Sequence, residues 1–133
     1  MRIESLKRYK KPSHRRVRME QMIQEVISDL LHRGRIKDRA IIDASITVTH
    51  VNCSEDFKYA DVYVSELSTR VPSGVERNQL MLGFKRATAF IAAEVNQYLH
   101  RYRGPELRFK IDDQLYRAEY LVDLIEKTSK AVS

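Results

Sequence analysis

The side chains best suited to catalysis or metal binding in this chain are four histidines and one cysteine. The histidines, at positions 14, 32, 50 and 100, are scattered, and no two of them stand four residues apart as zinc ligands on one helix face do. His50 is expected to be a structural or surface residue. Cys53 could act as a nucleophile only beside a base and an orienting group, and no local signature indicates them. We therefore predict no catalytic residue and no metal site, and a small half-buried thiol at position 53.

Carboxylates and glycines also lack a catalytic arrangement. Asp112 and Asp113 are adjacent, so in an extended segment their side chains point apart and suit a helix start better than paired acid and base work. Glycines occur only at positions 34, 74, 83 and 104, and no pair fits a phosphate-binding loop. We predict no cofactor. Gly34 is expected to end a helix, and Gly83 to pack a helix closely onto a sheet.

Basic residues are more informative because they are concentrated in two places. The 133 residues carry 24 Lys or Arg against 18 Asp or Glu, a net charge of +6. Residues 1–18 hold eight of the basic residues against Glu4 alone, whereas residues 19–76 are acidic overall, at −4. A flexible cationic arm neutralises phosphates and releases counterions; the alternative is a solubilising tail. The basic residues from this arm that we predict to contact RNA are Lys7, Arg8, Lys10, Lys11, Arg15, Arg16 and Arg18.

A second basic cluster lies between residues 77 and 110, which hold seven Lys or Arg against Glu94 and Glu106. Two of these cations, Lys85 and Arg86, come just before a stretch of small residues in a long helical pattern. Four others lie around the end of that pattern and in the strand that follows it. Cations fixed on folded elements can position a protein on phosphates. The members of this cluster that we predict to contact RNA are Lys85, Arg86, Arg101, Arg103, Arg108 and Lys110.

Hydrophobic periodicity indicates the elements that must position these residues. Apolar residues at helical spacing predict a helix over residues 13–33. Alternating apolar and polar residues predict an antiparallel hairpin of strands 45–53 and 59–67. In the first of these strands the apolar parity shifts, which predicts a bulge near Thr49 and His50.

The longest helical pattern covers residues 76–102, which would span about 40 Å as one straight helix. That length is roughly three times the radius of gyration of a domain of this size, so we predict a kink or a break into two helices. A third strand over residues 107–111 and a last helix over residues 114–130 follow. The small residues predicted at the interhelical kink are Ala87, Thr88 and Ala89.

The predicted order is helix, strand, strand, helix, helix, strand, helix. Three strands with helices on one face make an α+β sandwich, and this order is that of the type II KH fold. KH domains grip single-stranded nucleic acid with a G-x-x-G loop between two helices, and this chain lacks that loop. We predict one KH type II-like domain without the loop over residues 13–130, a flexible basic arm over residues 1–12 and a tail over residues 131–133.

The cysteine count and the lengths of the apolar stretches indicate the cellular compartment. A lone cysteine cannot form an intramolecular disulfide, and no apolar stretch approaches the roughly 18 residues that span a bilayer. The basic start lacks the apolar core of a secretion signal, although an organellar transit segment is an alternative. We expect a monomer in the cytoplasm, without membrane contact.

Five segments resemble the ribosome-binding factor A family, whose members are small-subunit maturation factors with a KH type II variant fold. In order, they are RV at 16–17, DR at 38–39, ITVTHVNCSEDFKYADVYVS at 46–65, RATAF at 86–90 and PELRFKID at 105–112. The resemblance covers about residues 14–125. The family's kink is commonly Ala-x-Gly, whereas Ala89 stands at the third position here, which predicts a shallower kink or two helices that are more continuous.

This resemblance implies a non-catalytic protein that binds the free small (30S) ribosomal subunit and its 16S ribosomal RNA and assists late processing and assembly. It implies that the basic face of the second and third helices docks on phosphates. Two alternatives from other classes remain. One is a free-standing KH-like binder of single-stranded RNA, which the missing loop disfavours; the other is a small enzyme, for which no catalytic constellation is present.

Overall fold

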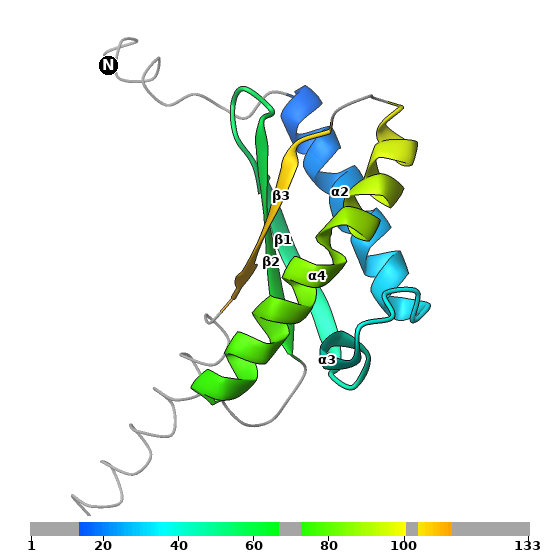
Figure 1. The fold of residues 1–133 in the computed structure, drawn as a ribbon. Helices are drawn as coiled ribbons and strands as arrows, with labels where there is room; N and C mark the ends of the chain where they lie inside the picture. The colour runs from blue at the N-terminus through cyan, green and yellow to red at the C-terminus, as the bar shows by residue number, and fades with distance from the viewer. Residues whose placement is uncertain (1–13, 67–72, 101–103, 113–133) are drawn as a thin grey trace, which may run out of the picture.

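The computed structural model describes residues 14–66, 73–100 and 104–112. Its elements are α2 (His14–His32), α3 (Arg39–Ile42), β1 (Ile46–Cys53), β2 (Tyr59–Glu66), α4 (Gly74–Leu99) and β3 (Glu106–Ile111). The strands form one sheet in the order β1-β2-β3, and α2 and α4 cover one face of it (Figure 1). The predicted α+β class is confirmed. The predicted last helix, the tail and the residues of the arm before position 14 lie outside the described residues.

The core lies between the sheet and its two long helices. β1 pairs antiparallel with β2, as predicted, and β3 runs parallel to β2. Alternate residues of the central strand point into the core, where Ala60, Val62 and Val64 are fully buried. Phe84 of α4 stacks on Phe109 of β3, with ring centroids 4.6 Å apart. The intervening residues of β2 and β3 therefore point to the opposite, outer face of the sheet.

Gly34 ends helix α2, as its position in the sequence predicts. Its φ is +64°, a left-handed conformation that glycine adopts without steric cost. The Gly34 N–H donates to the carbonyl of Leu31 at 3.2 Å, and the Arg35 N–H donates to the carbonyl of Leu30 at 3.0 Å. These two bonds are those of a Schellman motif, which turns the chain sharply out of the helix.

The predicted bulge in β1 is confirmed. Val48 pairs with Val64 and His50 pairs with Tyr63, so Thr49 is the extra residue. The bulge moves the later residues of β1 to the opposite parity, and Cys53 is buried as a result. It also places the Thr49 hydroxyl where it donates to Asp112 Oδ2, at 2.7 Å.

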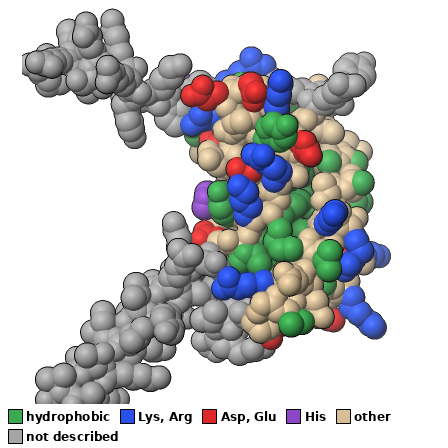
Figure 2. Space-filling model, turned by 60° about the vertical axis from the view of Figure 1, so that its left-hand side comes forward, with side chains coloured by type: hydrophobic (Ala, Val, Ile, Leu, Met, Phe, Trp, Pro, Cys, Tyr) green, Lys and Arg blue, Asp and Glu red, His purple; other side chains and the backbone are tan. Residues whose placement is uncertain are grey.

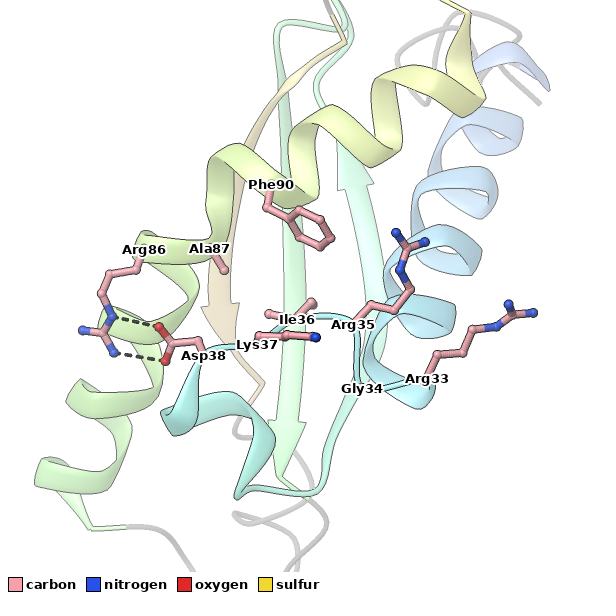
Figure 3. A pocket seen from close by; sticks show the side chains of 9 residues that line it. All are labelled: Arg33, Gly34, Arg35, Ile36, Lys37, Asp38, Arg86, Ala87 and Phe90. Carbon is pink, nitrogen blue, oxygen red and sulfur yellow. Dashed lines mark hydrogen bonds and ion pairs between the residues drawn. The ribbon is translucent and has the colours of Figure 1, made fainter.

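Helix α4 is one continuous α-helix, so the predicted break into two helices is wrong, and the alternative drawn from Ala89, a more continuous helix, is confirmed. The alanines at positions 87 and 89 are good helix formers and keep the backbone hydrogen-bond ladder intact. The Thr88 hydroxyl donates to the carbonyl of Phe84 at 2.7 Å, a contact that bends helices. In Figure 3 the axis of α4 changes direction beside Ala87.

The short helix α3 is absent from the sequence prediction. Asp38 caps it, because its carboxylate accepts a hydrogen bond from the Ala40 N–H at 3.1 Å. Gly83 of α4 faces this segment: a Cβ at position 83 would lie 3.1 Å from the Cβ of Ala40 and 3.3 Å from Cγ1 of Ile41. The expectation that Gly83 packs onto the sheet is therefore wrong, since its close neighbour is α3.

Candidate nucleic-acid interface

Among the residues with a described structure, the chemically reactive groups form no metal cluster of three or more His, Cys, Asp or Glu side chains. Burial, reinforced by the charge of Glu20, raises the pKa of the Cys53 thiol to about 11. A thiol with so high a pKa is a poor source of thiolate nucleophile near neutral pH. Within the same part of the chain, no helix is long and apolar enough to cross a membrane.

The predicted basic arm is described only where it enters helix α2. Lys7, Arg8, Lys10 and Lys11 lie outside the described residues. Arg15, Arg16 and Arg18 are all in α2, and Arg15 lies over the ring of Phe57 in the β1–β2 turn, with its guanidinium carbon 5.5 Å from the ring centroid. Arg18 is exposed. Arg101 and Arg103 of the second basic cluster also lie outside the described residues.

Lys85 and Arg108 both line a groove between α4 and β3, although 23 positions separate them in the sequence. This α4–β3 groove has a volume of about 540 Å³. Leu107 and Phe109 contribute to its lining together with Met81 and the half-exposed Leu82. The groove therefore combines apolar side chains with two exposed cations, one from each element. Its full lining is Asn78, Met81, Leu82, Lys85, Thr88, Leu107, Arg108 and Phe109.

Arg108 also reaches the outer face of the sheet, where Lys110 accompanies it. Asp61 accepts from both cations: Arg108 Nε lies 2.8 Å from Oδ1, and Lys110 Nζ lies 3.3 Å from Oδ2. The Arg108 guanidinium carbon is 4.4 Å from the ring centroid of Tyr59, and Lys110 Nζ is 5.9 Å from that of Tyr63. On the side of the molecule seen in Figure 2, Lys and Arg side chains lie among hydrophobic side chains. Aromatic rings and a carboxylate thus fix the direction of these two cations.

Arg86 lies on the other flank of α4 from Lys85, because neighbouring residues of a helix are about 100° apart. Its guanidinium makes a bidentate ion pair with Asp38, with Nε 2.8 Å from Oδ2 and Nη2 3.1 Å from Oδ1. The hydrogen bonds from Arg86 hold the pKa of the Asp38 carboxyl below its ordinary value, and the Ala40 N–H contributes in the same direction. The structure therefore separates the two neighbouring cations: Lys85 faces the α4–β3 groove, and Arg86 joins α4 to the start of α3.

Sequence reasoning missed three cations that line a second groove with Arg86. Arg33, Arg35 and Lys37 follow the end of α2, and all three are exposed. This α4–loop groove, drawn in Figure 3, has a volume of about 850 Å³ and includes the ring of Phe90. The signal was the R-G-R-I-K run at 33–37, in which cations alternate with a glycine and one apolar residue. Its full lining is Arg33, Gly34, Arg35, Ile36, Lys37, Asp38, Arg86, Ala87 and Phe90.

Comparison with known proteins relates the chain to one family. Residues 15–125 match the family described as "Ribosome-binding factor A". The chain is 30% identical over 122 residues to ribosome-binding factor A of Rhodospirillum rubrum, covering 92% of this chain and 71% of that protein. It is 33% identical over 116 residues to the protein of the same name from Clostridium botulinum (strain Eklund 17B / Type B), covering 87% of this chain and 96% of that protein.

Solved structures with the same fold include a Thermotoga maritima protein determined by solution NMR, at 31% identity and a TM-score of 0.60, covering 77% of this chain and 91% of that one. The crystal structure of ribosome-binding factor A from Thermus thermophilus gives a TM-score of 0.58 at 18% identity, covering 72% of this chain and 93% of that one. A homology model of the Thermus thermophilus factor, fitted into a cryo-EM map of a 30S complex with that factor, gives a TM-score of 0.54 at 20% identity, covering 71% of this chain and 92% of that one.

Proposed function

The chain belongs to the ribosome-binding factor A family, and on that premise we propose that it binds the free small (30S) ribosomal subunit through its 16S ribosomal RNA. In this role it assists late RNA processing and subunit assembly without catalysing a reaction. It acts as a monomer in the cytoplasm. The observation that carries the proposal is that Lys85 of α4 and Arg108 of β3 both line the α4–β3 groove.

The α4–β3 groove suits an RNA backbone for two reasons. Lys85 and Arg108 stand on two different elements, so their spacing is held by the packing of α4 on β3 rather than by a flexible loop. The apolar groups between them, including Leu82, offer a surface for sugars and bases. Phosphate contacts of this kind position a protein without reading sequence, so specificity comes from the shape of the ribosomal RNA.

A purely binding role is supported by the state of the reactive groups. Cys53 is buried, and its pKa of about 11 keeps it as a thiol. The His50 ring stacks on the Tyr63 ring, with ring centroids 4.1 Å apart. Its Nδ1 lies 3.6 Å from Asp112 Oδ2. These contacts fix the imidazole on the outer face of the sheet, outside both grooves, where it has a structural role.

Sedimentation of purified 30S subunits with the protein at low salt tests the proposal. The wild-type protein should travel with the subunit, and Lys85→Glu should weaken this binding by reversing the charge beside the expected phosphates. Because Lys85 is exposed, the variant should keep the wild-type unfolding temperature. Lys58→Glu makes the same charge change in the exposed β1–β2 turn and serves as the matched control. A wild-type protein that stays at the top of the gradient would refute ribosomal binding.

A further inference from the structure

We infer that the α4–loop groove is a second RNA site, which takes an unpaired nucleotide with its base stacked on Phe90 and its flanking phosphates on Arg33, Arg35 and Lys37. The inference rests on the proposed RNA binding and deepens it by naming single-stranded RNA as the ligand of this groove. The first support is the way the loop between α2 and α3 is built. The left-handed Gly34 ends α2, and the next three residues run to the cap of α3 at Asp38.

Ile36 determines how the cations of this loop point. It is 2% exposed and belongs to the core, whereas its two neighbours, Arg35 and Lys37, are exposed. One buried anchor between two cations fixes the backbone of the loop and turns both cations toward solvent. At the other end, the bidentate pair between Arg86 and Asp38 ties the loop to α4. The groove is therefore preformed, and a ligand would not have to order it.

The charge of the groove favours a polyanion. Arg86 and Asp38 neutralise each other, which leaves three cations in the loop. Arg33 pairs with Asp29 at 2.9 Å and Arg35 with Glu94 at 3.5 Å, and the side chains of both arginines are more than half exposed. The Asp29 side chain is 48% exposed, whereas that of Glu94 is only 17% exposed, so the Arg33–Asp29 pair is exposed at both ends and the Arg35–Glu94 pair at the arginine alone. Ion pairs with an exposed arginine are weak, so a phosphate can compete with the carboxylate for it. Lys37 makes no ion pair with any residue of the described part of the chain.

Phe90 distinguishes RNA from other polyanions. Its side chain is 40% exposed although it is large and apolar, and it lies one turn beyond Arg86 on α4. Figure 3 shows its ring directed toward the segment that carries Arg35 and Ile36. A nucleobase can cover such a ring by stacking while its own phosphates reach the loop cations. An acidic peptide would supply carboxylates to the cations but would leave the ring exposed. The groove volume of about 850 Å³ is in the range of small-ligand sites.

Binding of the full-length protein to two fluorescently labelled RNAs, one single-stranded and one duplex of the same length, tests the inference. Phe90→Ala should weaken single-strand binding about tenfold and leave duplex binding unchanged, because only an unpaired base can stack. Phe90→Tyr keeps a ring and should bind as the wild type does. Tyr98→Ala removes another exposed aromatic ring from α4, outside the groove, and should have no effect. Lys37→Gln should weaken binding to the single strand and lower its salt slope by about one.

The outcomes separate this inference from the proposed function. If Phe90→Ala binds single-stranded RNA as tightly as the wild type, the stacking site is refuted, and sedimentation of Lys85→Glu with 30S subunits still decides the proposed function. Equal losses on both RNAs would also refute stacking, because a duplex offers no unpaired base. An unchanged unfolding temperature of Phe90→Ala ensures that a loss of binding is not a loss of folding. If that variant unfolds, Phe90→Leu replaces it, since leucine keeps the apolar volume but has no ring.

Discussion

The carboxylate of Asp38 occupies the space that a side chain at position 83 would need, because a Cβ on Gly83 would lie 2.9 Å from Asp38 Oδ1. The same carboxylate accepts from the Ala40 N–H and from two nitrogens of Arg86. Gly83 thus allows α3 to approach α4, and Arg86, three residues later, holds it there. One acidic side chain joins the cap of a short helix to the flank of a long one, and the α4–loop groove depends on this junction.

Replacing Gly83 should therefore destabilise the protein. Gly83→Val should lower the free energy of unfolding by about 1–3 kcal/mol, because the new side chain meets Asp38, Ala40 and Ile41. Gly74→Val is the matched control, since nothing lies within 4 Å of a Cβ at position 74, which is also in α4. Chemical denaturation measures both variants. Equal stability of the two would contradict the close contact.

The ion pair between Asp38 and Arg86 predicts a dependence of stability on pH. Because Arg86 holds the folded-state pKa of Asp38 below its ordinary value of 3.8, this contribution is complete above that value and is lost as the pH falls through the lower, folded-state pKa. Asp38→Asn should therefore be less stable than the wild type at neutral pH and approach it as the pH falls below 3.8. Asp43→Asn, an exposed change at the other end of α3, is the control. The measurement is the free energy of unfolding of each protein as a function of pH. A difference between wild type and Asp38→Asn that stays constant with pH would contradict the prediction.

The thiol of Cys53 should be inert in the folded protein. It is 3% exposed, and with a pKa of about 11 only about one molecule in a thousand carries the thiolate at pH 8. Mass spectrometry after incubation with an alkylating reagent should show unlabelled native protein and complete labelling in denaturant. Rapid labelling without denaturant would show that the end of β1 opens readily. Cys53→Ala should bind 30S subunits as the wild type does.

Removing Asp61 should release the two cations that it now neutralises on the outer face of the sheet. Arg108 and Lys110 both donate to its carboxylate, so Asp61→Asn leaves both cations free to meet phosphates. If this face contacts RNA, the variant should bind more tightly, and its salt slope should increase by about one. Asp56→Asn removes one negative charge from the β1–β2 turn and controls for net charge. Identical binding by both variants would place the outer face away from the RNA.

The basic arm should determine much of the salt dependence of RNA binding. Deleting residues 2–11 removes five cations and Glu4, so the slope of log affinity against log salt should fall by as much as about four. The single-stranded RNA used to test the α4–loop groove provides this measurement. An unchanged slope would favour the solubilising tail over the RNA-binding arm.

The elements predicted correctly from sequence are those whose own periodicity specifies them. Local sequence alone specifies helix α2, through its apolar stripe with Gly34 beyond it. It also specifies strands β1 and β2, through their alternation, and the bulge, through the parity shift at Thr49. Helix α3 was missed because four residues carry no period, and its cap at Asp38 depends on no repeated pattern. The predicted break in α4 was wrong because a change to small residues was read as an interruption, although alanine favours a helix.

The candidate sites were predicted less well, because they depend on contacts between distant segments. Lys85 and Arg108 are both predicted to contact RNA, but that they line one groove follows from the packing of α4 on β3. The cations at 33–37 were missed because they lie in a segment that is acidic overall, and the turn at Gly34 that presents them beside α4 depends on the fold. Arg86 is predicted to contact RNA, whereas its pairing with Asp38, 48 residues earlier, is visible only in three dimensions.

The parallel pairing of β3 with β2 also constrains how the chain can fold. The β1–β2 hairpin closes within a few residues, but the contact between Asp61 and Arg108 spans 47 residues. Closing so long a loop costs more entropy, and non-local pairing slows folding. During synthesis the hairpin and α4 emerge before β3, so the partner of β2 and the stacking partner of Phe84 arrive last. A nascent chain of this protein therefore completes its core only after Phe109 has left the exit tunnel of the ribosome that makes it.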